Sequence, residues 1–117
     1  MKAIVAFIKP HKLGDVTLAL HGLDDMTGMT VTDVRGFGRT RAQGSEHVVT
    51  DEVADFVRKT RIDIVCSDPM VDTIVETIRR HAHTGAHGDG KIYVWDVAQA
   101  VRIRTGETNA DAIQGIA

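Results

Sequence analysis

Apolar residues recur along the chain with two alternating periods, one typical of strands and one typical of helices. A short apolar run, residues 3–8, ends at a lysine and a proline and predicts a strand that the proline stops. A helical pattern follows, and Gly22 marks its end. Residues 29–34 are rich in β-branched side chains and predict a second strand, which Gly36 and Gly38 close. The apolar stripe of the predicted helix consists of Leu13, Val16, Leu20 and Leu23.

The same order of strand, helix and strand returns in the second half of the chain. Residues 61–67 predict a strand, and Asp68 is a suitable N-cap for a helix with Pro69 in its first turn. Residues 91–97 predict a fourth strand. Two strand–helix–strand units in one chain predict a ferredoxin-like βαββαβ sandwich, an α+β fold. The apolar face of the second helix consists of Val71, Ile74, Val75, Ile78 and Ala82.

A long connection, residues 37–59, separates the second and third strands. Its first part, residues 38–47, is polar and without a clear period, which predicts an exposed, mobile loop. In residues 48–57 several apolar residues also fit a helical spacing, so the pattern is compatible with either a helix or a loop. So long an excursion in a small domain is usually functional or disordered.

The length of the chain predicts a single domain, residues 1–117, which ends in a tail at residues 108–117. The composition places few constraints on binding partners. A net charge of −2 gives no electrostatic reason to expect nucleic acid or an anionic membrane. No apolar run suits a membrane span or a signal peptide, so a cytoplasmic protein is expected. The single cysteine, Cys66, lies in an apolar run and predicts a buried, inert thiol.

Two helices on one side of four strands would leave the other sheet face uncovered. That face carries apolar side chains, which other subunits would bury most simply. The pattern therefore predicts an oligomer, and we expect a trimer.

Candidate chemistry gathers in residues 84–91, Thr-Gly-Ala-His-Gly-Asp-Gly-Lys, directly before the fourth predicted strand. Successive backbone N–H groups in a glycine-rich loop can form an anion site, and Lys91 adds a positive charge. Arg102 and Arg104 would place both guanidiniums on one face of an extended segment, in a geometry that suits phosphates. The order differs from a P-loop and from a Rossmann fingerprint. The sequence of this segment is therefore compatible with two interpretations, a polyphosphate site and a simple turn.

Histidines and basic residues invite two further hypotheses. His81, His83 and His87 are close in sequence, but they complete no recognised zinc spacing, so no metal site is expected. His87 lies inside the glycine-rich segment, where its imidazole could make anion affinity depend on pH near about 6.5. A basic patch could serve solubility, partner docking or phosphate contact; it consists of Arg39, Arg41, Arg58, Lys59 and Arg61.

Three segments, residues 27–39, 84–91 and 102–107, resemble the PII signal-transduction family, also called nitrogen regulatory protein P-II. The resemblance runs from residue 1 to about residue 108. It implies a ferredoxin-like homotrimer that binds ATP or ADP in clefts between subunits. It also implies a non-catalytic signalling protein that regulates a target, such as a transporter or an enzyme of nitrogen or carbon metabolism, through the long loop.

The resemblance also implies which residues meet the nucleotide. Adenine would lie near Gly28, Met29, Thr30 and the backbone of Asp63 and Ile64. The long loop would open beside the cleft at Gly36, Phe37 and Gly38. The phosphates would be met by Arg39, His87, Gly88, Asp89, Gly90, Lys91, Arg102 and Arg104.

The long loop departs from the family pattern at two positions. Thr40 occupies the usual glutamine position, and Glu52 occupies the position of the tyrosine that is nucleotidylylated in relatives. Tyrosine modification of the loop is therefore not expected. A threonine hydroxyl substitutes weakly for the amide that would hold magnesium and 2-oxoglutarate, so Mg²⁺ stays open and 2-oxoglutarate sensing is not expected. Lys59 keeps the position of the carboxylate-binding lysine, so Thr40 and Lys59 are the candidate effector contacts.

Two alternative functions are compatible with the fold. A slow ATPase would need a general base, for which Asp89 is the evident candidate, although it is equally suited to be a turn residue. A metal-tolerance trimer that binds no nucleotide is disfavoured by the glycine-rich segment and the arginine pair. The target protein and the preferred nucleotide do not follow from the residues.

Overall fold

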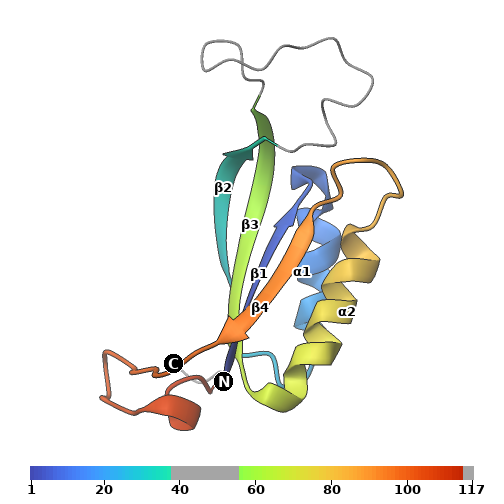
Figure 1. Ribbon diagram of the computed structural model, residues 1–117. Coiled ribbons are helices and arrows are strands. Elements are labelled where there is room, and N and C mark those ends of the chain that lie inside the picture. Colours follow the sequence, from blue (N-terminus) through green and yellow to red (C-terminus); the bar gives the residue numbers. More distant parts are fainter. Residues whose placement is uncertain (38–55, 115–117) are drawn as a thin grey trace.

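The computed structural model describes residues 1–37 and 56–114, which form a four-stranded antiparallel sheet with both long helices on one face (Figure 1). The order of the strands across the sheet is β2-β3-β1-β4. This is the ferredoxin-like arrangement that the sequence predicts. The elements are β1 (Lys2–Ile8), α1 (Leu13–His21), β2 (Thr30–Gly36), β3 (Val57–Cys66), α2 (Val71–Ala82) and β4 (Lys91–Asp96), with short 3-10 turns at Pro10–Lys12, Asp68–Met70 and Asn109–Asp111.

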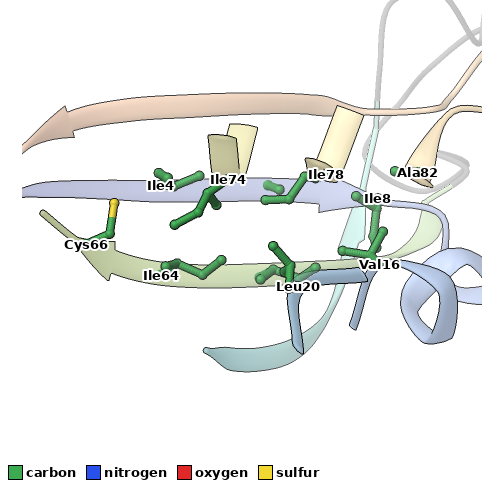
Figure 2. Close-up of a cluster of buried hydrophobic side chains, with 11 residues drawn as sticks. Ile4, Ile8, Val16, Leu20, Ile64, Cys66, Ile74, Ile78 and Ala82 are labelled. Carbon is green, nitrogen blue, oxygen red and sulfur yellow. The ribbon is translucent and has the colours of Figure 1, made fainter. Parts of the chain in front are cut away.

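The core lies between the sheet and the two helices, and β1 is its central strand. Ile4 lies opposite Ile64 on β3 and opposite Val94 on β4. Because side chains alternate along a strand, every second residue of β1 and β3 points toward the helices. Cys66 belongs to this cluster, and burial raises the pKa of its thiol, so the predicted buried cysteine is confirmed. Figure 2 shows the cluster of Ile4, Ala6, Ile8, Val16, Leu20, Ile62, Ile64, Cys66, Ile74, Ile78 and Ala82.

Both helices present the apolar stripes that their periodicity predicts, but the predicted cap of the second helix is wrong. A 3-10 turn, Asp68–Met70, precedes α2, and Met70 is the N-cap residue. Pro69 lies in that turn, so the regular helix starts only at Val71. The carboxylate of Asp68 instead accepts a hydrogen bond from the amino group of Met1 at 2.8 Å.

Strand β3 begins at Val57 rather than near Arg61, which corrects the predicted end of the long loop. The pairing of β3 with β1 stops at Thr60, whereas its pairing with β2 continues to Val57. Two charged residues in succession hide the alternating pattern of this part of the strand. We call the two-stranded extension, residues 34–36 and 57–59, the arm. The expectations for Gly38, Arg39, Thr40, Glu52 and most of the helix-or-loop segment lie outside the described residues.

On the sheet face opposite the helices, β4 carries apolar side chains, and β3 contributes a charged side chain. Tyr93 and Trp95 are 47% and 49% exposed, respectively. The Phe7 ring packs edge-on against Tyr93 at 6.3 Å, and the Arg61 guanidinium lies 5.7 Å from the centre of the Phe7 ring. Neither long helix covers this face, as the sequence predicts (Figure 1). Within residues 1–37 and 56–114, no helix has the length and hydropathy that crossing a bilayer requires.

Helix α1 offers a matched pair of leucines for testing the core. Leu20 is 1% exposed and Leu18 is 77% exposed. We expect Leu20→Ala to lower the free energy of unfolding by about 2–5 kcal/mol, because it leaves a cavity between the helix and the sheet. Leu18→Ala should change it by less than about 0.5 kcal/mol. Urea unfolding followed by circular dichroism measures both, and equal losses would contradict the assignment of the core.

Candidate functional site

Between α2 and β4, residues 84–90 form a loop that we call the glycine loop, and its end is tightly packed against β1. Gly90 has a φ of 102°, and a Cβ atom at this position would collide with the carbonyl oxygen of Phe7. Only glycine fits this close approach at a positive φ. Glycine at position 90 is therefore required by the way the loop meets the end of β1.

The carboxylate of Asp89 closes the glycine loop from within. It accepts hydrogen bonds from the backbone N–H groups of Thr84 at 2.8 Å and Gly85 at 2.9 Å, and also from the Thr84 hydroxyl. The Lys9 ammonium lies 3.1 Å from the same carboxylate. The Thr84 hydrogen bonds are the main reason why the pKa of Asp89 is far below its usual value. Asp89 is thus a turn residue held as a carboxylate, and a carboxylate of such low pKa is a poor general base.

Two lysines from outside the glycine loop donate hydrogen bonds to it. The Nζ of Lys9 also donates to the Thr84 hydroxyl at 3.0 Å, and the Nζ of Lys59 donates to the carbonyl oxygen of Gly88. Partial burial, followed by the charge of Lys9, lowers the pKa of Lys59. Lys91 begins β4 directly after the loop. Lys9 and Lys59 contact the loop, Lys91 directly follows it in sequence, and Asp89 is its single carboxylate, so three positive charges and one negative charge lie in or next to the glycine loop.

Lys9 is a site residue that sequence reasoning missed. In the β1–β4 register Phe7 lies opposite Lys91, so a continuation of the same pairing places Lys9 opposite Asp89. The only sequence signal was a lysine directly after the first predicted strand. Its significance depends on the register, which the pattern of residues does not specify.

The residues expected near adenine lie together at the β2 edge of the sheet. Thr30 is opposite Asp63 in the β2–β3 register, and the Thr27 hydroxyl donates to the Val65 carbonyl at 2.7 Å. The two residues between Thr27 and Thr30, Gly28 and Met29, therefore lie beside the end of β3. The structure thus groups Gly28, Met29, Thr30, Asp63 and Ile64.

Gly36 belongs to a second group at the other end of β2. A Cβ atom on Gly36 would lie 3.9 Å from Cγ of Lys59, whose Nζ reaches the glycine loop. Phe37 follows and is 43% exposed. Because a strand rises about 3.3 Å per residue, Gly36 and Thr30 are about 20 Å apart. One chain therefore presents two separate groups of predicted site residues, which we call the phosphate-side group and the adenine-side group after the contacts expected of them.

The prediction that Arg102 and Arg104 share one face of an extended segment is wrong. The N–H of Gly106 donates to the carbonyl of Arg102, and the N–H of Arg102 donates to the carbonyl of Glu107, both at 2.8 Å. These bonds close a tight turn, and Gly106 supplies the positive φ of 75° that the turn requires. Alternation therefore does not apply to these arginines.

The two arginines also lie away from the glycine loop of their own chain. The Arg102 guanidinium donates to the carbonyls of Ala112 at 3.3 Å and Gln114 at 2.6 Å. Lys91 is at the start of β4, whereas Arg102 follows its end, and Figure 1 shows these segments at opposite ends of the sheet. A single chain thus does not bring Lys91, Arg102 and Arg104 together.

The described histidines are dispersed, and no group of three or more His, Cys, Asp or Glu side chains in residues 1–37 and 56–114 is placed to hold a metal ion. The Nδ1 atom of His81 lies 2.9 Å from the carbonyl oxygen of Thr77. His87 is exposed on the glycine loop, next to Gly88. Its effect on anion affinity stays a prediction.

Asp89→Asn tests whether the carboxylate holds the loop. Because the folded-state pKa of Asp89 is depressed, its stabilising contribution is complete above the unfolded-state pKa of about 3.9 and is lost as pH falls toward the folded-state pKa. We therefore expect Asp89→Asn to lower the free energy of unfolding at pH 7, and the deficit to shrink below about pH 4. Urea unfolding across pH 3 to 8 measures this, with Asp25→Asn in an exposed turn as control. A deficit that is absent at pH 7 would contradict the role of Asp89.

Comparison with known proteins agrees with this geometry. The family model for nitrogen regulatory protein P-II matches residues 1–107. The chain is 51% identical to nitrogen regulatory protein P-II of Klebsiella oxytoca and to nitrogen regulatory protein P-II 1 of Escherichia coli strain K12. It is 49% identical to the P-II protein of Pasteurella multocida. Each alignment spans 97% of this chain and the full length of the relative. The chain therefore belongs to the nitrogen regulatory protein P-II family.

Proposed function

We propose that this protein is a non-catalytic sensor that binds ATP or ADP in clefts between the subunits of a homotrimer and regulates a target protein. The observation that carries the proposal is the glycine loop, whose shape is held by hydrogen bonds and an ion pair within the chain. Asp89 and Lys9 are bonded inside the loop, while Gly88 and Gly90 are exposed beside Lys91. Backbone N–H groups and an ammonium in this arrangement suit the phosphate chain of a nucleotide.

The separation of the cationic residues supports a site between chains. Arg102 and Arg104 cannot join Lys91 within one chain, because β4 lies between them. Packing the exposed Tyr93 and Trp95 against a neighbouring chain would bury an uncovered apolar face. A second chain that brings its arginine turn to the first chain's glycine loop would complete the set of cations. The adenine-side group at the β2 edge would then belong to a different chain from the glycine loop.

The arrangement favours binding over hydrolysis. Asp89 is the acidic residue of the glycine loop, and its internal hydrogen bonds occupy the carboxylate and keep its pKa low. A metal-tolerance function would not require exposed glycines next to Lys91, whereas phosphate binding would use both. We therefore favour a regulator in which ATP and ADP differ in their effect.

A route from the nucleotide to the target runs through Lys59. This residue lies in β3 on the arm and contacts Gly88 of the glycine loop. A ligand on the glycine loop would act on the arm through this contact. Its effect is limited to the difference between its affinities for the two states of the protein. The target would be a transporter or an enzyme of nitrogen or carbon metabolism, and the protein would work in the cytoplasm.

Lys91→Ala should weaken ADP binding by about 10- to 100-fold, because it removes a charged donor from the phosphate group. Isothermal titration calorimetry measures the dissociation constant. Lys12→Ala, which removes a lysine paired with Asp15 on the surface, should leave it unchanged. Phosphate release from ATP should stay at background in the wild type. A release that disappears with Lys91→Ala would instead support the slow ATPase.

Mixing two defective variants tests whether the cleft is shared. Lys91→Ala and Arg104→Ala should each bind ADP weakly as pure proteins. After subunits exchange, a cleft with Lys91 from one chain and Arg104 from another is intact, and random association makes about a quarter of the clefts intact. We expect that fraction of high-affinity sites by calorimetry. Co-purification of differently tagged chains controls for exchange. No recovery in an exchanged mixture, or a monomeric mass by light scattering, would contradict the shared cleft.

A further inference from the structure

An open cavity of about 280 Å³ lies where the arm joins the rest of the sheet, lined by Asp33, Val34, Arg35 and Arg58. Arg58 and Lys59 are neighbours in β3, so they point to opposite faces of the arm. Lys59 reaches the glycine loop, and Arg58 therefore belongs to the other face. This cavity is distinct from the proposed nucleotide site.

The cavity brings two like charges together. Arg35 lies directly opposite Arg58 in the β2–β3 register, and both residues are exposed. Like charges at directly opposed positions of an antiparallel pair destabilise it. The arginines in ion pairs within the described chain are Arg61, Arg79 and Arg102. Within residues 1–37 and 56–114, neither Arg35 nor Arg58 is joined to a carboxylate by an ion pair, although Asp33 lines the same cavity, and an anion between the two guanidiniums would relieve their repulsion.

The size and charge of the cavity indicate the class of anion. Arg35, Arg58 and Asp33 together carry a net charge of +1, which matches one carboxylate better than a doubly charged phosphate. The volume of about 280 Å³ is just below the range of about 300–1,000 Å³ that is usual for small-molecule sites, so a single side chain fits better than a nucleotide. Guanidinium forks bind carboxylates through paired hydrogen bonds.

We propose that Arg35 and Arg58 form a docking site on the arm for a glutamate or aspartate side chain of the target protein. The inference rests on the proposed function, since it assumes a protein target, and it names the chemistry of the contact. The arm extends beyond β1, so a partner segment can approach the cavity without displacing the core. Target docking and nucleotide binding then use opposite faces of the same two strands.

Arginine side-chain NMR on the full-length protein tests the docking site. The probes are acetyl-Gly-Glu-Gly-amide, the matched glutamine peptide and inorganic phosphate. We expect the glutamate peptide to shift the Nε–H signals of Arg35 and Arg58 saturably, and the glutamine peptide to leave them in place. Arg35→Gln and Arg58→Gln should each lower the affinity for the glutamate peptide by about three- to tenfold. Arg80→Gln, the same change at an exposed arginine of α2, should have no effect.

Several outcomes would overturn the inference. A response of Arg80 equal to that of Arg35 would indicate general screening, and tighter binding of phosphate would indicate a phosphate ligand. A gain in peptide affinity when Glu46, Asp51, Glu52 and Asp55 are changed to amides would indicate that the chain's own acidic residues occupy the site. ADP titration of the same samples separates the two proposals. ADP binding without a peptide response overturns only the docking site, whereas loss of ADP binding by the wild type overturns the proposed nucleotide function.

Discussion

The close contact between the glycine loop and the end of β1 is the constraint on which the candidate site depends. Gly90 leaves room for the Phe7 carbonyl, and Asp89 joins the two ends of the loop to Lys9. Together these contacts fix where Lys91 enters β4 and where Lys59 can reach the loop from the arm. The contacts that hold this arrangement all come from groups of one chain.

The same fold that builds the loop also leaves it incomplete. Strand β4 carries Lys91 at one end and leads to Arg102 at the other, so the cations of one chain diverge. The exposed Tyr93 and Trp95 lie on the sheet face that the long helices leave uncovered. A cleft between chains would satisfy both conditions at once. Nucleotide binding and assembly would then be properties of the same surfaces.

The fold was predictable from the sequence because its elements have clear periods. The two helical stripes and the strands around Ile4 and Ile64 follow from spacing alone, and so does the buried Cys66. The start of β3 was not predictable, because Arg58 and Lys59 interrupt the apolar alternation. Secondary-structure boundaries thus failed where charge replaced periodicity.

The candidate site was predictable as a set of residue types but not as a geometry. The glycines and Lys91 marked the loop, and the family resemblance added the residues at the β2 edge. The partnership of Lys9 with Asp89 depends on the strand register, and the turn at Arg102 depends on backbone hydrogen bonds near Gly106. Both are tertiary or local backbone features without a period. The place of the arginines relative to the loop follows only from the length and direction of β4.

Amide hydrogen exchange of the ligand-free protein tests most directly whether the glycine loop is preformed. The N–H groups of Thr84 and Gly85 donate to the Asp89 carboxylate, so we expect both to exchange more slowly than in an unstructured chain before any nucleotide is added. ADP should then add little protection at these two positions. Exchange at the unstructured rate until ADP is added would contradict the account, because the ligand would then impose the shape of the loop.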